Sequence, residues 1–304
     1  MSPTATLPPQ RPFGAVLTAM VTPFTPDGDL DLDTAQRVAV HLVDAGNDGL
    51  VVAGTTGESP TLAEEEHDAL LRAVVEAVGD RAFVVAGSGN NDTRHSVLRA
   101  QAAEKTGVHG LLVVTPYYSK PPQEGLVRHF RAVADSTGLP VMVYDIPGRT
   151  GVALSTETLL RLGEHPRIVA VKDAKDDLFA ASRVLAGGEL AWYSGSDQLN
   201  LAHLTQGAAG LVSVVGHVAG PQYAAMVAAV DSGDLATAVG LHRRLLPAVE
   251  TIMTTTQGAI MAKAAMQLVG VLSNRVMRLP LVDATDSQVD LLRAALAESD
   301  LLPA

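Results

Sequence analysis

Short aliphatic segments recur along the chain and alternate with segments in which apolar residues lie three and four positions apart. The first pattern is typical of strands buried on both faces of a parallel sheet, and the second is typical of amphipathic helices. The aliphatic segments span residues 15–21, 49–53, 82–86, 110–114, 140–144, 168–172, 190–194 and 210–214. The helical segments between them include residues 34–45, 62–78, 93–105, 123–136, 156–162 and 198–205.

This alternation predicts the fold class. Eight strand–helix units within about 220 residues match the size of an α/β protein with a (β/α)8 TIM barrel. A doubly wound sheet is the competing architecture. It would more often carry a glycine-rich dinucleotide turn after the first strand, where this chain has Thr22-Pro23-Phe24.

The last part of the chain shows helical spacing alone. From about Gly220 onward, apolar residues keep this spacing in residues 234–252, 259–272 and 287–301. We expect a last barrel helix followed by a few appended helices. The predicted organisation is a loose tail over residues 1–12, a catalytic barrel over residues 13–230 and a small C-terminal all-helical domain over residues 231–304.

Composition narrows the function classes. The net charge of −11 argues against a nucleic-acid partner, because nucleic-acid binding depends on basic patches. The absence of cysteine excludes disulfides, thiolate catalysis and zinc–thiolate sites. Residues 1–12 lack the basic and apolar regions of a signal peptide, and no window of 18 residues is apolar and free of charge. We therefore expect a cytoplasmic protein with no membrane partner.

Lys172 is the first candidate for chemistry, because it closes the aliphatic segment 168–171. The carboxyl end of a buried strand is where α/β enzymes place their reactive groups. Burial lowers the pKa of an amine and makes it a nucleophile that can form a Schiff base with a carbonyl substrate. A lysine that extends into solvent or into an ion pair is the commoner structural alternative.

A glycine-rich turn follows the second predicted strand and contains Thr55 and Thr56. Thr61 and Glu64 match the spacing of a capping box, so a helix is expected to begin beside this turn. Free backbone N–H groups at a helix N-terminus suit a carboxylate. An ordinary strand-to-helix turn would use the same residues for local hydrogen bonds.

Further polar side chains follow the fourth and fifth predicted strands. Tyr117 and Tyr118 come after the fourth strand, where paired aromatics are more often core or interface residues. Tyr144 ends the fifth strand, and Arg149 lies in the loop after it, where its fork could hold a carboxylate. In a barrel these strand ends converge on one site. A lysine, a tyrosine, a pair of threonines and an arginine together predict a class I aldolase-type site.

Other motifs give no support for a cofactor or a metal. No phosphate-binding loop or H-E-x-x-H motif occurs, and Gly87-Ser88-Gly89 lacks the spacing of a dinucleotide fingerprint. His203 and His217 follow late barrel strands, and we interpret both as structural and not as metal ligands. We expect neither a cofactor nor a metal ion.

Four motifs in this order resemble the dihydrodipicolinate synthase family, within the N-acetylneuraminate lyase superfamily. They are Gly54-Thr-Thr-Gly-Glu-Ser59, Thr115-Pro-Tyr-Tyr118, Tyr144-Asp-Ile-Pro-Gly-Arg-Thr-Gly151 and Val171-Lys-Asp-Ala174. The resemblance runs from about Phe13 to the end. It implies a (β/α)8 barrel with a helical C-terminal domain, and a homotetramer built as a dimer of dimers. It also implies condensation of pyruvate with L-aspartate-4-semialdehyde to 4-hydroxy-tetrahydrodipicolinate, the first committed step of diaminopimelate and lysine synthesis.

The resemblance also implies roles for single residues. Lys172 would form the imine with pyruvate, and Tyr144 would shuttle protons to and from it. Thr55 would link Tyr144 to Tyr118, which family members insert from the neighbouring subunit. Thr55 and Thr56 would hold the pyruvate carboxylate, and Arg149 would bind the carboxylate of the semialdehyde. Val212 and Gly195 match positions whose backbone groups lie near the pyruvate adduct.

Two departures from the family pattern matter. Many members read Glu-Ala-Ser/Thr after the nucleophile, whereas this chain reads Asp173-Ala174-Lys175; alternation along the strand turns Asp173 away from Lys172. Regulated members bind lysine near positions matched here by Ser59, His67, Asn91 and Tyr117, a possible effector site. Pro60, Glu64 and His95 do not match, and His95 replaces an acidic residue that would pair the effector's amine. We therefore predict weak or no inhibition by lysine.

Two other functions compete with the synthase. A sister lyase for N-acetylneuraminate or 2-keto-3-deoxy sugar acids would share Lys172 and Tyr144, although Arg149 and the threonine pair favour the synthase. A non-catalytic barrel that binds pyruvate is the alternative from another class.

Overall fold

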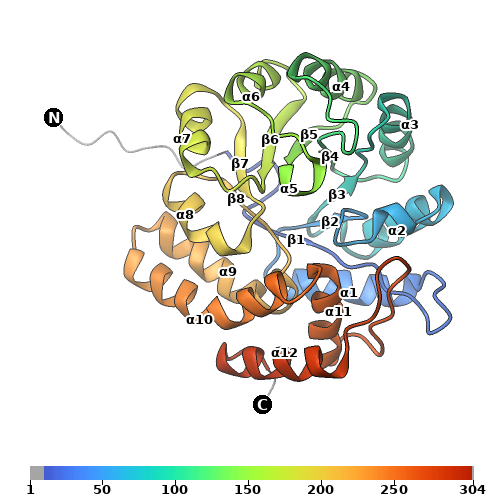
Figure 1. Cartoon of the computed structure of the whole chain (residues 1–304), viewed down its shortest axis with the longest axis vertical. Helices are drawn as coiled ribbons and strands as arrows, with labels where there is room; N and C mark the ends of the chain where they lie inside the picture. Colours follow the sequence, from blue (N-terminus) through green and yellow to red (C-terminus); the bar gives the residue numbers. More distant parts are fainter. Residues whose placement is uncertain (1–9, 303–304) are drawn as a thin grey trace.

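The computed structural model describes residues 10–302. Eight parallel strands close into a barrel in sequential order, as predicted (Figure 1). They are β1 (Val16–Ala19), β2 (Gly49–Val52), β3 (Phe83–Gly87), β4 (Gly110–Val114), β5 (Val141–Asp145), β6 (Ile168–Asp173), β7 (Ala191–Ser194) and β8 (Gly210–Ser213). The barrel confirms the (β/α)8 class and excludes the doubly wound alternative, because β1 pairs with β8.

Helices cover the outside of the barrel (Figure 1). They are α1 (Leu32–Asp44), α2 (Glu64–Val78), α3 (Thr93–Glu104), α4 (Gln123–Asp135), α6 (Thr156–Gly163), α7 (Leu178–Gly187), α8 (Asn200–Thr205) and α9 (Gly216–Asp231), and the short α5 (Pro147–Thr150) follows β5. The pattern of apolar residues missed α7, whose buried side chains are Ala181 and Val184. It also missed the start of α9, which is kinked at Ala219 and contains Pro221.

The capping box predicted from Thr61 and Glu64 is wrong. Residues Ser59–Thr61 form a short 3-10 helix, in which the Thr61 hydroxyl donates to the Glu58 carbonyl at 3.0 Å. Helix α2 begins at Glu64, and the Ala63 N–H donates to the Glu66 carboxylate at 3.0 Å. Only the reciprocal half of a capping box is present, because Ala63 has no hydroxyl to cap the helix.

The barrel wall separates two apolar layers, and alternation along each strand assigns every residue to one of them. Met142 and Ala170 lie inside the barrel, with Leu17 and Val212. Val143 and Val171 lie between the strands and the helices. Residues two positions apart along a strand face the same side of the wall. The side chains that end β5 and β6 therefore alternate between the barrel interior and the layer under the helices.

Three helices follow the barrel: α10 (Leu235–Thr254), α11 (Gly258–Leu268) and α12 (Asp286–Glu298). They share an apolar core with α9 and β1 and lie together on one side of the barrel (Figure 1). The domain boundary between residues 230 and 231 stays a prediction, and residues 1–9 of the predicted tail lie outside the described residues. Within residues 10–302, no helix is both long and apolar enough to cross a membrane.

Candidate active site

Lys172 points into the barrel at the end of β6. It lies two residues after Ala170, an interior residue, and its side chain is 5% exposed. Tyr144 is its neighbour in register on β5, and the Lys172 Nζ lies 4.3 Å from the centre of the Tyr144 ring. The structure therefore brings together the predicted nucleophile and the predicted proton donor, and it rules out a lysine that extends into solvent.

The environment of Lys172 favours its neutral form. Burial lowers the pKa of this amine to about 8, Asp197 opposes the change, and Arg149 adds to it. A lysine with an ordinary pKa of about 10.4 is neutral only about once in a few thousand molecules at pH 7, whereas this one is neutral in about one molecule in ten. Desolvation thus supplies much of the free amine that Schiff-base chemistry needs.

Tyr144 stays protonated in this environment. Burial raises the pKa of its phenol to about 12, while Arg149 and a side-chain hydrogen bond with Thr55 lower the pKa. A neutral phenol can donate a proton or a hydrogen bond to a developing oxyanion. Thr55 thus lies close enough to Tyr144 to affect its pKa, and the predicted link from Tyr144 through Thr55 to Tyr118 stays a prediction.

Gly195 leaves room for the lysine side chain. A Cβ atom at this position would lie 3.0 Å from the Lys172 Cγ and 3.1 Å from its Cε. It would also lie 2.9 Å from the backbone oxygen of Asp173, with which the Gly195 N–H is hydrogen-bonded. Val212 lies inside the barrel on β8 and is buried. Gly195 thus leaves room for the Lys172 side chain, and the predicted backbone contacts of Gly195 and Val212 near the adduct stay predictions.

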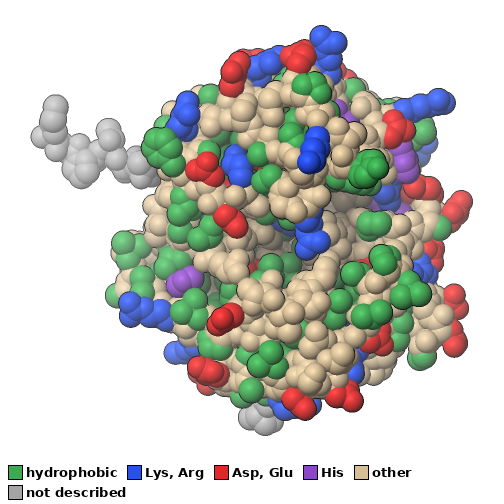
Figure 2. Space-filling view, viewed as in Figure 1, with side chains coloured by type: hydrophobic (Ala, Val, Ile, Leu, Met, Phe, Trp, Pro, Cys, Tyr) green, Lys and Arg blue, Asp and Glu red, His purple; other side chains and the backbone are tan. Residues whose placement is uncertain are grey.

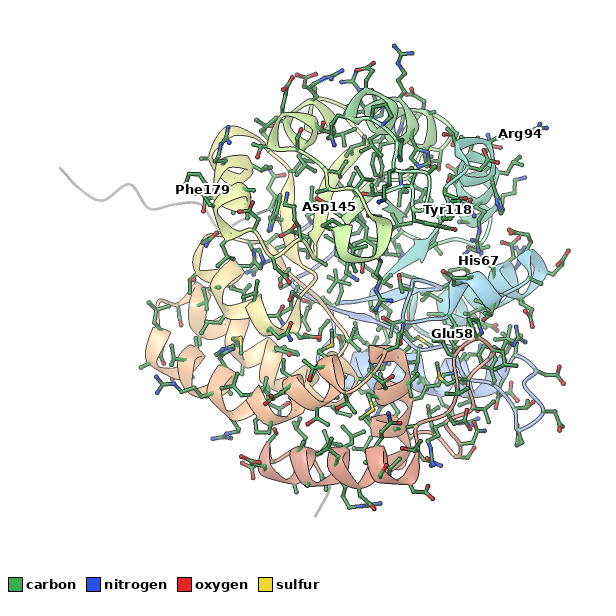
Figure 3. All side chains as sticks on the ribbon, in the orientation of Figure 1. Glu58, His67, Arg94, Tyr118, Asp145 and Phe179 are labelled. Carbon is green, nitrogen blue, oxygen red and sulfur yellow. The ribbon has the colours of Figure 1, made fainter. Side chains whose placement is uncertain are left out.

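A cavity of about 410 Å³ opens at the carboxyl ends of β2 to β5, and its lining includes Thr55, Tyr117, Tyr118 and Arg149. Figure 2 shows that this face of the molecule is hollowed near its centre, with Lys and Arg side chains beside the hollow. Tyr118 is 89% exposed and has a φ of +73°, a strained value for a non-glycine residue (Figure 3). Its predicted place in a neighbouring subunit stays a prediction.

The possible effector residues are only partly brought together. Ser59 and Tyr117 line the same cavity, beside Asn90. His67 projects from α2, is buried, and places its Nε2 3.0 Å from the Gly87 carbonyl oxygen (Figure 3). Asn91 is exposed and is not among the residues that line the cavity.

The sequence did not identify Glu58 as part of the support for the threonine turn. The Glu58 carboxylate is buried and accepts from the Lys263 Nζ at 2.6 Å and from the Arg278 N–H at 2.9 Å. Glu58 thus joins the turn that carries Thr55 and Thr56 to the C-terminal segment (Figure 3). A lysine within the apolar run of α11 was the available signal, because such a residue needs a buried partner.

Asp197 is a second residue that the sequence did not single out. Its carboxylate is buried and accepts from the Val214 and Val215 N–H groups at 2.8 and 3.0 Å and from the Asn200 side chain at 2.9 Å. It is the counter-charge that keeps the pKa of Lys172 from falling further. Its position three residues after the seventh strand was the available signal.

His203 and His217 are both buried within the fold. The His217 Nε2 accepts from the Val21 N–H at 3.0 Å, its Nδ1 lies 2.7 Å from the Val214 carbonyl oxygen, and burial lowers its pKa to about 4. His203 is buried, with its Nε2 3.7 Å from the Asp173 carboxylate. Within the part of the chain that the structure describes, no three His, Asp or Glu side chains form a group that could hold a metal ion.

Comparison with known proteins assigns the family. The profile of the Dihydrodipicolinate synthetase family matches residues 12–299. The chain is 64% identical over 303 residues to the 4-hydroxy-tetrahydrodipicolinate synthase of Kineococcus radiotolerans, covering 99% of this chain and 98% of that protein.

Two solved structures have the same fold. The lysine-bound enzyme of Cyanidioschyzon merolae has a TM-score of 0.93 at 41% identity, covering 96% of this chain and 100% of that one. The chloride-inhibited enzyme of Acinetobacter baumannii, complexed with pyruvate, has a TM-score of 0.91 at 32% identity, covering 95% and 100%. The chain therefore belongs to the dihydrodipicolinate synthetase family and is a Schiff-base-forming lyase.

Proposed function

We propose that this enzyme condenses pyruvate with L-aspartate-4-semialdehyde to give 4-hydroxy-tetrahydrodipicolinate. The observation that carries the proposal is the buried Lys172 amine, which lies 4.3 Å from the centre of the Tyr144 ring. Thr55 and Arg149 line a cavity at the neighbouring strand ends. The names of the relatives and the pyruvate complex of the Acinetobacter baumannii enzyme support both the reaction and the first substrate. The reaction would be the first committed step of diaminopimelate and lysine synthesis.

The first half of the reaction forms an imine. The neutral Lys172 amine attacks the keto carbon of pyruvate, and water leaves after Tyr144 has delivered a proton to the oxygen. Thr55 and Thr56 hold the pyruvate carboxylate through hydroxyl and backbone N–H groups. Tyr144, which has given up its proton, then takes a proton from the methyl group. The electron pair of the broken C–H bond forms the C=C bond of the enamine, and the imine electron pair moves onto the Lys172 nitrogen.

The second half forms the new carbon–carbon bond. The enamine attacks the aldehyde carbon, and the relay of Tyr144, Thr55 and Tyr118 protonates the aldehyde oxygen. The guanidinium of Arg149 binds the semialdehyde carboxylate. The amino group of the second substrate then displaces Lys172 from the imine carbon, so the product closes into a ring and the enzyme is free again.

A sister lyase for N-acetylneuraminate or 2-keto-3-deoxy sugar acids would use the same lysine and tyrosine. Turnover of pyruvate with aspartate semialdehyde, measured beside cleavage of N-acetylneuraminate, separates the two functions. We expect turnover only in the first assay, and turnover only in the second would refute the proposal. Borohydride reduction with pyruvate should place the mass adduct on Lys172; an adduct on Lys175 would overturn the assignment of the nucleophile.

We also propose that the enzyme is a cytoplasmic homotetramer in which Tyr118 completes the site of a neighbouring subunit. The exposure and strained backbone of Tyr118 support this arrangement. Mixing two inactive variants, Lys172→Ala and Tyr118→Ala, tests it. Hybrid dimers should regain activity, because the site with an intact Lys172 receives Tyr118 from the other chain. Mixtures that stay inactive although hybrids form would show that Tyr118 acts within its own chain.

A further inference from the structure

A buried ionic cluster lies on the outer side of the barrel wall, directly behind Lys172 and Tyr144. Asp145 and Asp173 follow these two residues, face each other in register and point away from the barrel interior. Both carboxyl groups are buried. Lys175 completes the cluster. Its backbone N–H donates to the Asp173 carboxylate at 3.3 Å, and its side-chain Nζ lies 3.6 Å from Asp145 Oδ2.

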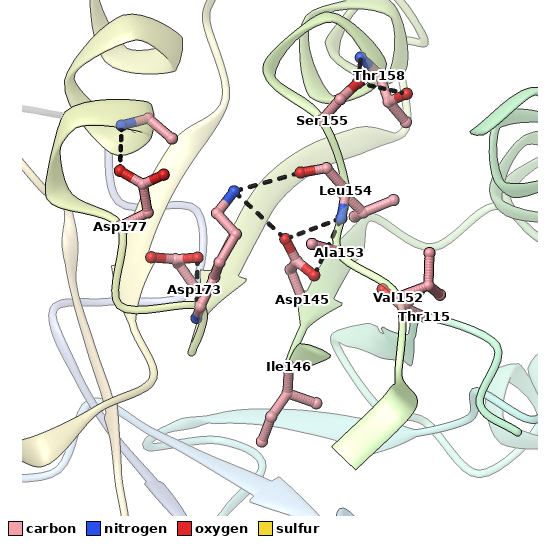
Figure 4. Close-up of polar contacts among 12 residues, drawn as sticks. Thr115, Asp145, Ile146, Val152, Ala153, Leu154, Ser155, Thr158, Asp173 and Asp177 are labelled. Carbon is pink, nitrogen blue, oxygen red and sulfur yellow. Dashed lines mark hydrogen bonds and ion pairs between the residues drawn. The ribbon is translucent and has the colours of Figure 1, made fainter. Parts of the chain in front are cut away.

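This cluster closes the loop that carries Arg149. The Leu154 N–H donates to both oxygens of the Asp145 carboxylate, at 3.3 and 3.2 Å, and the Lys175 Nζ donates to the Leu154 carbonyl at 3.3 Å (Figure 4). The loop over residues 146–153 therefore leaves β5 at Asp145 and returns to the same carboxylate at Leu154. Lys175 follows the end of β6, so its side chain closes this loop by contacting both Leu154 and Asp145.

We propose that Lys175 is a positioning residue that clasps the Arg149 loop to the end of β6, and so fixes the distance between the carboxylate-binding arginine and the Schiff-base lysine. The inference deepens the proposed function and rests on it for the role of Arg149. Arg149 itself is exposed and lines the cavity, so its position depends on how the ends of its loop are held. The backbone adds one further link, from the Ala174 N–H to the Asp145 carbonyl at 2.8 Å.

Electrostatics explains why a lysine is needed at this point. Burial raises the pKa of Asp145 to about 6 and that of Asp173 to about 7, and in both cases the Lys175 ammonium opposes the rise. Without the ammonium, the two facing carboxylates would repel each other or bind protons. A protonated Asp145 would accept the Leu154 N–H more weakly, and the Leu154 carbonyl would lose its donor. The clasp would then loosen while the strands remained paired.

A double-mutant cycle between Lys175 and Arg149 tests the clasp in the whole enzyme. The variants are Lys175→Met, Arg149→Ala and their combination, and Lys105→Met is the control at an exposed lysine at the end of α3. Lys175→Met should raise the KM for the semialdehyde about tenfold, equal to about 1.4 kcal/mol. It should leave borohydride trapping of pyruvate within about twofold. In the Arg149→Ala background, Lys175→Met should add little, because residues that act through one another are not additive.

Hydrogen exchange measured by mass spectrometry gives a readout that does not depend on the substrate. Lys175→Met should speed exchange in peptides that cover residues 146–154 and leave β3 unchanged. Unchanged exchange in this loop, or KM effects that add fully in the double variant, would overturn the clasp. A normal KM for the semialdehyde in Arg149→Ala would instead contradict the proposed function. In that case, faster exchange of the loop in Lys175→Met would still support the clasp. If Lys175→Met folds poorly, Asp173→Asn with Lys175→Met removes one carboxylate with the ammonium and should show the same loop exchange.

Discussion

Replacing Lys263 with methionine should destabilise the enzyme strongly, although Lys263 lies in the C-terminal helices and far along the chain from the nucleophile. The Lys263 side chain is 1% exposed and donates to Glu58 at 2.6 Å and to the Val276 carbonyl at 2.7 Å. Removing one partner of a buried ion pair leaves the other charge without compensation, which typically costs about 3–5 kcal/mol. The Arg278 N–H remains on Glu58 and favours the lower end of this range.

The expected size can be measured by thermal unfolding. For a chain of this length, a loss of about 3 kcal/mol lowers the Tm by about 5 °C. The double variant Glu58→Gln with Lys263→Met should recover most of the loss, because a neutral amide leaves no buried charge and can still accept from Arg278. Lys105→Met, at an exposed position, should leave the Tm unchanged.

The same substitution should also reach the active site. Glu58 ends the turn that carries Thr55 and Thr56, so a displaced carboxylate should move these hydroxyls and lower kcat/KM at temperatures where the enzyme is folded. A Tm within about 1 °C of the parent enzyme would refute the reasoning. So would a double variant no more stable than Lys263→Met alone, because the loss would then not come from the unpaired charge.

Three further predictions follow from the site and its surroundings. Asp173→Asn should raise the Tm relative to the parent by about 4 °C more at pH 8 than at pH 5, because burial raises the pKa of Asp173 from 3.8 to about 7 and the parent loses stability as pH rises through this range; an equal shift at both pH values would contradict this. Gly195→Ala should slow borohydride trapping of pyruvate about 100-fold, because its Cβ would displace the Lys172 stem, and trapping at the parent rate would refute it. Lysine should inhibit weakly or not at all, since the His95 Nε2 lies 3.0 Å from the Glu64 carboxylate; strong inhibition at sub-millimolar lysine in a coupled assay would show this to be wrong.

The sequence was sufficient for the barrel because the signal for each strand is local. Each strand is a short aliphatic segment, and the eight segments together allow one closed parallel arrangement. The pattern failed where local preference conflicts with packing. Helix α9 runs through Pro221 and a kink at Ala219, and α7 buries few large side chains. Burial against the barrel, which the sequence does not state, keeps these segments helical.

The candidate site divides in the same way. The convergence of Lys172, Tyr144 and Thr55 was predictable, because in a barrel the strand ends face one site. The buried pair of Glu58 and Lys263 was not, since its members are 205 positions apart. No local pattern connects such residues, and a pairing of this kind becomes visible only when the chain is folded.

Alternation along β5 and β6 places the side chains of consecutive residues on opposite sides of the barrel wall. Lys172 and Tyr144 face the apolar barrel interior, where desolvation lowers the pKa of the amine and raises that of the phenol. Asp173 and Asp145 face outward, where they meet Lys175. A shift of either strand by one residue would place carboxylates in the barrel and the amine behind the wall. The register between Tyr144 and Lys172 therefore fixes the reactive pair and its ionic support together. Because the strands stay paired when the outer cluster loosens, the effect should be detected first in the loop over residues 146–154, while Lys172 still traps pyruvate.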